Sequence, residues 1–185
     1  MKVLVFDRCS SDDFNKDTVA EMIPDSAIIK DGKPFFIPAS APEWQYSCGV
    51  AVRVCRLGKN ISEKFAPRYI DAYAPCVTTV PAAVDRFNAL NRCHEGGIIL
   101  GEWQSPDECA AAFDFTTSTG STVTVDVNKS MSAAMVALIG SRGVLKIGDI
   151  IVMGQDRLAV DLPLDSRIRA VSGADGSVLL DFAVK

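Results

Sequence analysis

The densest group of reactive side chains in the sequence is the run Cys93, His94 and Glu95, a thiol, an imidazole and a carboxylate in consecutive positions. A cysteine and a histidine act as nucleophile and base only when their side chains touch, and adjacent residues usually point apart. His94 is the only histidine of the chain. We keep the three as catalytic candidates, but expect a helix end and a polar turn, where the helix dipole would favour a protonated His94.

The cysteines indicate buried thiols rather than a metal centre. Six are present, and no two have the CxxC spacing of zinc and thioredoxin-type sites. The apolar run Lys2–Phe6 soon reaches charged residues, which favours a strand over a secretory signal. We therefore expect a cytoplasmic protein whose thiols are small core groups. A metal-free enzyme that uses Cys93 or Cys76 is a further hypothesis, with no sequence feature in its favour.

Charge and hydropathy argue against two broad classes of function. The chain has 19 Lys and Arg against 23 Asp and Glu, a formal net charge of −4. This balance lacks the basic footprint of a nucleic-acid-binding protein, and no run approaches the roughly 18 apolar residues of a membrane span. The length of 185 residues, with no linker, predicts one domain over 1–185, in which residues 1–40 form a strand, a helix and a hairpin.

Hydrophobic patterning and turn residues predict many short strands and few helices. The predicted strands are 2–6, 47–56, 76–80, 96–103, 113–117, 122–127 and four closely spaced strands between 145 and 184. The predicted helices are 10–22, 60–70, 81–92, 105–113 and 130–139, and Asp31-Gly32 predicts a hairpin over 27–37. Because strands and helices do not alternate regularly, the pattern indicates an α+β fold.

Four stretches, in this order, resemble the fumarylacetoacetate hydrolase-like family. They are Ile28–Ser40 (IIKDGKPFFIPAS), Val50–Tyr73 (VAVRVCRLGKNISEKFAPRYIDAY), Gly148–Gly154 (GDIIVMG) and Val178–Val184 (VLLDFAV). The resemblance implies a mixed β-sandwich roll like that family's C-terminal domain, usually as a dimer. It leaves residues 1–40 as the most divergent portion.

The resemblance also implies an activity and a metal. Members cleave or isomerise β-dicarbonyl and 2-oxo acid compounds, and some decarboxylate oxaloacetate, with Mg²⁺ or Mn²⁺ held by three carboxylates and acting as a Lewis acid. Aligned on the strand that contains Val50, the family's Glu-x-Glu pair falls at Ser47 and Gly49, and its Asp falls at Thr78. None of the three supplies a negative charge, so we expect no metal cofactor.

Other positions of the family's site also lack their functional groups. The acid–base pair of the family would fall near Asp12 and Asp13, where there is no histidine. The catalytic lysine is missing from the shortened segment before Gly96. The loop that contacts the substrate's carboxylate reads Met153–Asp156 in place of Thr-Gly-Thr-Pro.

The sequence therefore favours a non-catalytic member that keeps the fold and the dimer surface, as a ligand-binding protein or a partner subunit. It would form a homodimer, or a heterodimer with an active relative, and bind neither nucleic acid nor membrane. The alternative is an active, divergent hydrolase, isomerase or decarboxylase with Mg²⁺ or Mn²⁺ on relocated carboxylates. Candidates for those carboxylates are Glu43, Asp85, Glu95 and Asp156, and candidates for ligand binding are Glu43, Gln155, Asp156 and Arg157.

Overall fold

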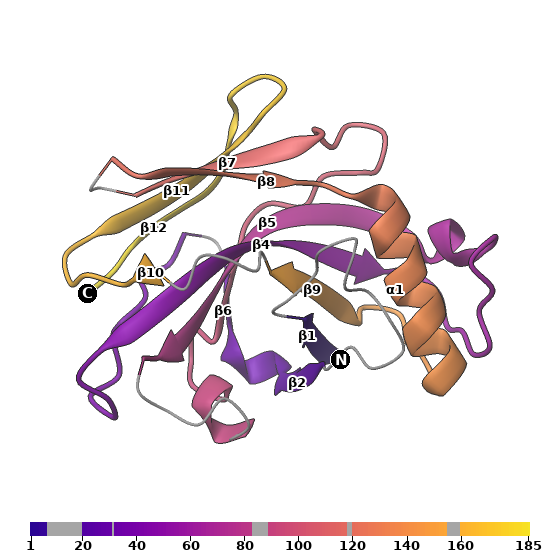
Figure 1. The fold of residues 1–185 in the computed structure, drawn as a ribbon, viewed down its shortest axis with the longest axis horizontal. Coiled ribbons are helices and arrows are strands. Elements are labelled where there is room, and N and C mark those ends of the chain that lie inside the picture. Colours follow the sequence, from indigo (N-terminus) through magenta and orange to yellow (C-terminus); the bar gives the residue numbers. More distant parts are fainter. Residues whose placement is uncertain (7–19, 31, 83–88, 118–119, 155–159) are drawn as a thin grey trace.

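Two β-sheets and one long helix make up the described part of the chain (Figure 1). This computed structural model describes residues 1–6, 20–30, 32–82, 89–117, 120–154 and 160–185. The larger sheet has eight strands in the order β2-β1-β9-β4-β5-β6-β3, with β10 paired to β4. Its strands are β1 (Lys2–Phe6), β2 (Glu21–Pro24), β3 (Ile28–Ile29), β4 (Trp44–Val54), β5 (Ile70–Pro81), β6 (Ile98–Leu100), β9 (Ile150–Gly154) and β10 (Val160–Asp161).

The larger sheet curls into a roll because its two edges are joined. β2 leads through the short 3-10 helix η1 (Asp25–Ala27) into β3, which pairs with β6 at the opposite edge. The enclosed face is a tightly buried apolar core. Its residues are Val3, Val5, Ile23, Ala27, Ala51, Ala74, Cys76, Ile98, Leu100, Ile150 and Val152.

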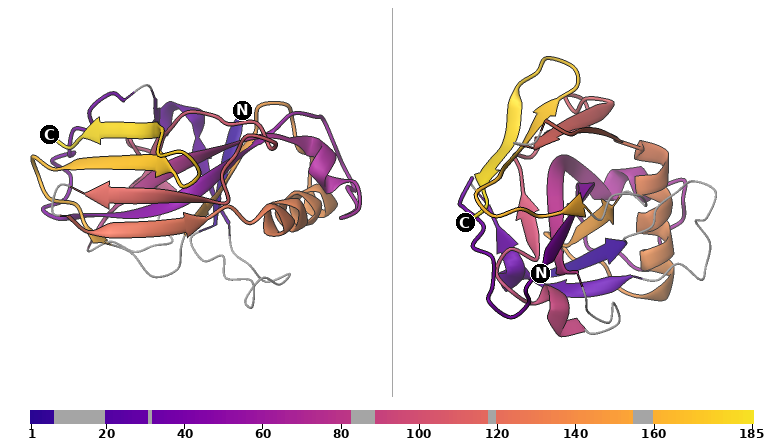
Figure 2. Two further views of the ribbon diagram at one scale, coloured as in Figure 1. Left: turned by 90° about the horizontal axis from the view of Figure 1, so that it is seen from above. Right: turned by 60° about the vertical axis from the view of Figure 1, so that its left-hand side comes forward.

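The outer face of the roll is covered by the smaller sheet and by the helix α1 (Lys129–Arg142), as Figure 2 shows. The smaller sheet has the order β12-β11-β7-β8. Its strands are β7 (Ala112–Thr117), β8 (Thr122–Asp126), β11 (Arg167–Ser172) and β12 (Val178–Ala183). Large side chains such as Phe113, Phe115 and Phe182 fill the space between the sheets. β4 and β5 are therefore buried on both faces, which explains why their sequences read as near-continuous apolar runs.

Helix α1 has clear sequence signals at both ends. The Asn128 side chain accepts a hydrogen bond from the backbone N–H of Met131 at 2.9 Å, and Gly143 ends the helix. A Cβ atom at Gly140 would lie 2.8 Å from Ile61 Cδ1, so the missing side chain lets α1 pack closely against the segment before η2 (Ala66–Tyr69). Within the described residues, no helix is long and apolar enough to cross a membrane.

Asp149, in the Gly148–Gly154 stretch, anchors the first strand of the chain to β9. Its buried carboxylate accepts hydrogen bonds from the backbone N–H groups of Lys2 (3.0 Å) and Lys146 (2.8 Å), and it forms an ion pair with the Lys2 ammonium. Burial alone would raise the pKa of Asp149, but the hydrogen bonds and the charge of Lys2 bring it below its ordinary value. The acidic residue of this motif therefore has a structural role here.

Most of the strand predictions are confirmed. Strands are present at 2–6, in 47–56, at 76–80 as part of the longer β5, in 96–103, at 113–117 and at 122–126. The predicted helix over 130–139 is confirmed as α1, and the last part of the chain forms β9 to β12. The α+β class with a mixed β-sandwich roll is thus the observed architecture.

The helices predicted before residue 113 form no α-helix in their described parts, although 3-10 helices lie within two of the predicted ranges. Pro67 allows only the 3-10 helix η2, and 105–109 form a turn in which the Ser105 hydroxyl donates to Glu108 at 2.8 Å. Pro81 ends β5, and only the 3-10 helix η3 (Ala89–Arg92) follows in the described residues. Tertiary pairing overrides these local signals, because a capping pattern contributes only about 1 kcal/mol.

The N-terminal helix and hairpin that the sequence predicts are not formed in their described parts. Residues 21–24 are the strand β2 rather than the end of a helix. The hairpin over 27–37 is absent from these residues, because β3 pairs in parallel with β6 and Phe35 pairs with Val184. Each half of the expected hairpin thus finds a partner more distant in sequence.

Asp149→Asn is expected to lower the free energy of unfolding at pH 7 by about 2 kcal/mol, since a hydrogen bond to a charged group contributes roughly 1.5–3 kcal/mol to stability. Because the pKa of Asp149 is lowered by folding, its contribution is present above the unfolded value of 3.8 and is lost as the pH falls through the folded value. Urea unfolding at pH 7 and pH 3 measures both effects.

Asp165→Asn is the matched control for this experiment. Asp165 is exposed and lies 3.8 Å from the Lys185 ammonium, so its loss should cost less than about 0.5 kcal/mol. Equal losses in the two variants would contradict the anchoring role of Asp149.

Candidate functional site

The three positions at which the sequence resemblance predicts metal ligands lie close together at one end of the roll. Ser47 of β4 and Thr78 of β5 are directly opposed across the two strands, and Gly49 pairs with Cys76. Strand alternation places Ser47, Gly49 and Thr78 on the face that carries Ala51 and Cys76, inside the roll. We call this region the Ser47–Thr78 end of the roll.

Gly49 is closed to any side chain by the neighbouring strand. A Cβ atom at this position would lie 2.6 Å from the backbone carbonyl oxygen of Met153 and 3.2 Å from the Cα of Gly154 on β9. Because both contacts are backbone atoms within the β4–β9 ladder, relief would require the strands to move. A carboxylate at Gly49 would therefore require β4 and β9 of this chain to separate from their present pairing.

The residues at this end do not fit a divalent metal. Ser47 and Thr78 present hydroxyl groups and Gly49 presents none, whereas Mg²⁺ sites rest on at least one or two carboxylates. Among the residues that the structure describes, no group of three or more His, Cys, Asp or Glu side chains could hold a metal ion. Ser47, Gly49 and Thr78 thus meet as the sequence predicted, without the chemistry of a metal site.

A buried ion pair, which the sequence did not predict, lies at the same end of the roll. Glu21, the first residue of β2, shares the inward-facing side of that strand with Ile23. Its carboxylate lies 2.7 Å from Nε of Arg92 in η3, and only 9% of the Arg92 side chain is exposed. The η3 segment runs beside β5 through Gly97, whose carbonyl accepts from the backbone N–H of Thr79 at 3.3 Å.

His94 lies in a small aromatic cluster on the other face of β5. Its ring centroid is 4.7 Å from that of Trp44 and 6.1 Å from that of Phe35. The Thr79 hydroxyl donates to the Gly96 carbonyl at 2.7 Å, and its oxygen lies 2.8 Å from His94 Nε2. Cys93, His94 and Glu95 thus follow the end of the 3-10 helix η3 and lie in a turn, as expected, but the half-buried His94 ring packs against Trp44 instead of facing solvent.

Folding favours the neutral form of His94. Burial lowers its pKa, the charge of Arg92 lowers it further, and a backbone hydrogen bond to Asn91 opposes the shift. Cys93 and Glu95 are exposed, while the His94 ring faces Thr79 and Trp44. The three consecutive candidates thus occupy different surroundings, and no nucleophile–base arrangement is built from them.

The remaining predicted residues do not assemble a second site. Glu43 is exposed at the start of β4, and its backbone carbonyl accepts from Ala82 at 3.0 Å. Cys76 is fully buried inside the roll, and burial raises the pKa of its thiol, which argues against a nucleophile. Six other candidates lie outside the described residues, namely Asp12, Asp13, Asp85, Gln155, Asp156 and Arg157.

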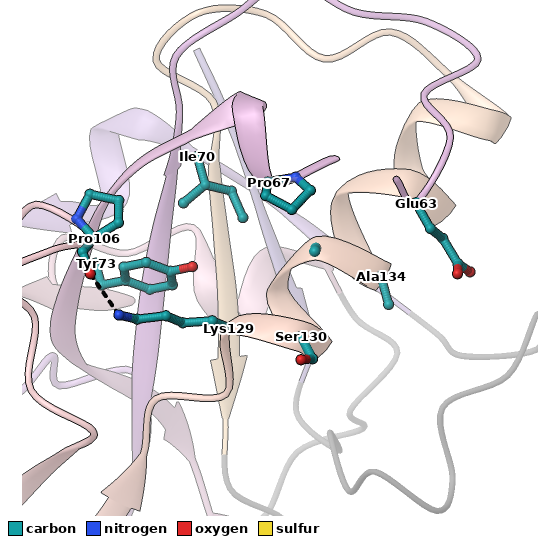
Figure 3. Close-up of a pocket in the computed structure, with 9 residues that line it drawn as sticks. Glu63, Pro67, Ile70, Tyr73, Pro106, Lys129, Ser130 and Ala134 are labelled. Carbon is teal, nitrogen blue, oxygen red and sulfur yellow. Dashed lines mark hydrogen bonds between the residues drawn. The ribbon is translucent and has the colours of Figure 1, made fainter. Parts of the chain in front are cut away.

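A separate pocket of about 420 Å³ lies between α1, η2 and the start of β5 (Figure 3). Its lining residues are Glu63, Pro67, Ile70, Tyr73, Pro106, Lys129, Ser130, Ala133 and Ala134. The Lys129 ammonium is already engaged by the Pro106 carbonyl at 2.6 Å. Burial raises the pKa of Tyr73, a shift that a hydrogen bond to Ser132 partly offsets. The pocket has an apolar centre and no convergent catalytic groups, and it lies toward the opposite end of β5 from Thr78.

The lowered pKa of His94 gives a pH-dependent stability. Its contribution is fully present above the unfolded pKa, near 6.5, and is lost as the pH falls through the folded pKa. We expect the urea midpoint of the wild type to fall between pH 7.5 and pH 5.5 more steeply than that of His94→Gln, which does not titrate. Identical slopes for the two proteins would show that His94 is protonated as easily in the folded chain as in the unfolded chain.

Comparisons with known proteins identify the fold. No protein-family model matches the chain, and no curated protein matches it. Among solved structures, it is similar to a 5-carboxymethyl-2-hydroxymuconate delta-isomerase from Mycobacterium smegmatis, with 18% identity, a TM-score of 0.80, and coverage of 100% of this chain and 79% of that one.

Two further solved structures agree with the first. A Yersinia pestis CO92 protein provisionally assigned to the fumarylacetoacetate hydrolase family has 13% identity and a TM-score of 0.81, over 100% of this chain and 92% of that one. A fumarylpyruvate hydrolase from Pseudomonas aeruginosa, in complex with Mn²⁺ and pyruvate, has 10% identity and a TM-score of 0.76, over 100% and 89%. The chain therefore has the fold of the fumarylacetoacetate hydrolase family, as the sequence resemblance implied.

Proposed function

We propose that this chain is a non-catalytic protein with the fumarylacetoacetate hydrolase fold, which acts as a ligand-binding protein or as a partner subunit. The observation that carries the proposal is the contact at Gly49, where the Met153 carbonyl occupies the space of a Cβ atom. A protein in which only Ser47 and Thr78 had changed could recover a metal site by two substitutions. At Gly49 the backbone itself excludes the carboxylate.

The similar solved structures provide a contrast to the side chains at this end of the roll. Similar structures are named as isomerases and hydrolases, and one contains Mn²⁺ and pyruvate. In this chain the corresponding end of the roll holds Ser47, Gly49 and Thr78 beside the Glu21–Arg92 pair. A guanidinium can bind an anion, but it lacks the empty orbitals with which a metal ion polarises a carbonyl group. These side chains support the proposal of binding without turnover.

The proposal also covers the oligomeric state and the cellular location of the protein. We expect a homodimer, or a heterodimer with an active relative, because the retained fold would retain a subunit surface after the site had changed. We expect the cytoplasm, because Cys48, Cys55, Cys76, Cys93 and Cys109 are all free thiols. The competing proposal is an active hydrolase, isomerase or decarboxylase with Mg²⁺ or Mn²⁺, which the similarity to a Mn²⁺-containing hydrolase favours.

Thermal unfolding with Mn²⁺, with and without oxalate, separates the two proposals. Ligand that binds only the folded state at 100 times its dissociation constant adds about 2.7 kcal/mol, or several degrees for a domain of this size. We expect no rise up to millimolar Mn²⁺. An unfolding temperature that rises with Mn²⁺, and rises further with oxalate, would contradict the non-catalytic proposal and favour the active enzyme.

A gain-of-site variant tests the same idea from the other direction. Ser47→Glu combined with Thr78→Asp places two carboxylates opposite each other on the inner face, where like charges repel until a cation binds. We expect Mn²⁺ to raise the unfolding temperature of this double variant, but not that of the uncharged control Ser47→Gln with Thr78→Asn.

Gly49→Glu provides the second comparison. Because its Cβ would meet backbone at 2.6 Å, we expect it to lower the unfolding temperature and to gain no response to Mn²⁺. A stable Gly49→Glu protein that binds Mn²⁺ would show that β9 can move, and would remove the main support for the proposal.

A further inference from the structure

We propose that an exposed basic and aliphatic surface beside the C-terminal end of α1 binds membranes that contain anionic lipids. We call it the Leu57–Ile147 surface, and it consists of Arg56, Leu57, Lys59, Val144, Lys146 and Ile147. The inference goes beyond the proposed function and does not depend on it. It concerns attachment to the surface of a bilayer, which requires no membrane-spanning helix.

Backbone hydrogen bonds on two sides hold the two segments of this surface together. On one side, the Val54 N–H donates to the Asp149 carbonyl at 2.9 Å, and the Val54 carbonyl accepts from Gly148 at 2.8 Å. On the other side, Gly58 and Leu145 exchange hydrogen bonds of 3.0 and 2.9 Å. The intervening residues of both segments therefore lie next to each other, at the end of the molecule where α1 leads toward β9 (Figure 1).

Three aliphatic side chains of this surface project into solvent. Ile147 is 71% exposed, Leu57 is 67% exposed and Val144 is 43% exposed. Ile147 lies at the apex of a tight turn, in which the Asp149 N–H donates to the Lys146 carbonyl at 3.1 Å. The next residue is a glycine with a φ of +85°, and a Cβ atom there would meet nothing within 4 Å. Exposed aliphatic side chains that gather on one face mark contact sites for proteins or membranes.

The charged residues of the two segments are all basic, although the whole chain has a formal net charge of −4. The stretches 55–62 and 140–148 contain no acidic residue. Their four basic residues, all exposed, are Arg56, Lys59, Arg142 and Lys146. The fold thus gathers positive charge around the exposed aliphatic side chains.

The carboxylates that border the surface leave this charge in place. Asp149 is buried and forms an ion pair with Lys2, so its charge is already compensated. Asp25 on η1 lies 4.0 Å from the amino group of the first residue. Glu63 is exposed, and the next residue in the chain is the exposed Lys64. A negatively charged membrane attracts exposed Lys and Arg residues, and each of them adds to the affinity.

The composition of the surface favours a lipid bilayer over a protein partner. A second copy that docked here about a two-fold axis would bring like charges together. The buried cores of protein interfaces are rich in aromatic residues and poor in lysine, whereas this surface has two lysines and no aromatic residue. Long basic side chains can reach lipid phosphates while Leu57 and Ile147 enter the boundary of the acyl chains.

This inference differs from the sequence-based expectation that the chain binds no membrane. That expectation rested on the charge of the whole chain and on the lack of a long apolar run. Neither property describes one surface, because segments that are far apart in the sequence supply its charges. Residues 55–59 and 144–147 meet only through the Gly58–Leu145 pairing and the contacts of Val54.

Sedimentation with lipid vesicles tests the inference on the full chain. One set of vesicles is pure phosphatidylcholine, and the other contains equal parts of phosphatidylcholine and phosphatidylglycerol. We expect the protein to bind the mixed vesicles at low salt and to bind the uncharged vesicles much more weakly, because the attraction depends on anionic lipid. Added salt should weaken binding, since it screens exposed charges.

Two double variants locate the contact. Lys59→Glu with Lys146→Glu should weaken binding about tenfold or more, since each basic residue near an anionic membrane contributes roughly fivefold. Leu57→Ser with Ile147→Ser should also weaken binding about tenfold or more, because it removes the apolar groups that would leave water. All four side chains are exposed, so the unfolding temperature should change little.

Lys33→Glu combined with Leu164→Ser is the matched control and should keep the affinity of the wild type. Both side chains are exposed. Their neighbours Phe35 and Leu162 contact Trp44 at the start of β4, whereas the proposed surface follows the end of that strand. The control therefore makes the same changes of charge and hydropathy at a distant place.

The absence of binding to the mixed vesicles at low salt overturns the inference, and so does equal binding to both lipid compositions. Unchanged binding of Leu57→Ser with Ile147→Ser overturns the location. Light scattering without vesicles tests a second copy as the occupant. A wild-type dimer that this double variant converts to a monomer overturns the membrane contact in favour of a subunit interface. The proposed function is judged separately, by the response to Mn²⁺.

Discussion

At Gly49 the carbonyl oxygen of Met153 lies where a side chain would begin, and this contact belongs to the central ladder of the roll. β9 is held against β4 from Gly49 to Arg53, and it is paired on its other side with β1. Asp149 then fastens β9 to the backbone of Lys2. Because three strands and a buried carboxylate fix the same register, β9 cannot withdraw from Gly49 without loosening the whole inner core.

The same register divides the functional residues between two faces. Trp44 and Tyr46 of β4 point into the core between the sheets, whereas Ser47 and Gly49 belong to the inside of the roll. On β5, Thr79 lies on the same face as Trp44 and Tyr46 and contacts His94. Thr78 lies on the same face as Ser47 and Gly49. An offset of one residue along each strand therefore separates the aromatic cluster at the end of β4 from the hydroxyl groups of Ser47 and Thr78 inside the roll.

The sequence allowed the long strands and α1 to be predicted, because their apolar periods are strong and α1 has an Asn cap and a terminal glycine. The sequence-based prediction is wrong where tertiary pairing outweighs a local signal. Ser105 and Glu108, for example, have a capping pattern but close only a turn. Ser47, Gly49 and Thr78 could be placed together by resemblance and strand period. The Glu21–Arg92 pair could not, because closure of the roll brings the two residues together and Glu21 had been assigned to a helix.

A divalent metal ion and a guanidinium differ in the chemistry that they can supply to an anionic ligand. A metal held by carboxylates both attracts an anionic substrate and withdraws electrons from its carbonyl group. A guanidinium does only the first, through directional N–H donors whose charge is never lost at physiological pH. The Arg92 guanidinium lies 2.7 Å from the Glu21 carboxylate, and an acidic neighbour of this kind offsets part of the cost of burial. Under the proposed function, the absence of a metal ion would remove carbonyl activation, and this loss would require no change of the fold.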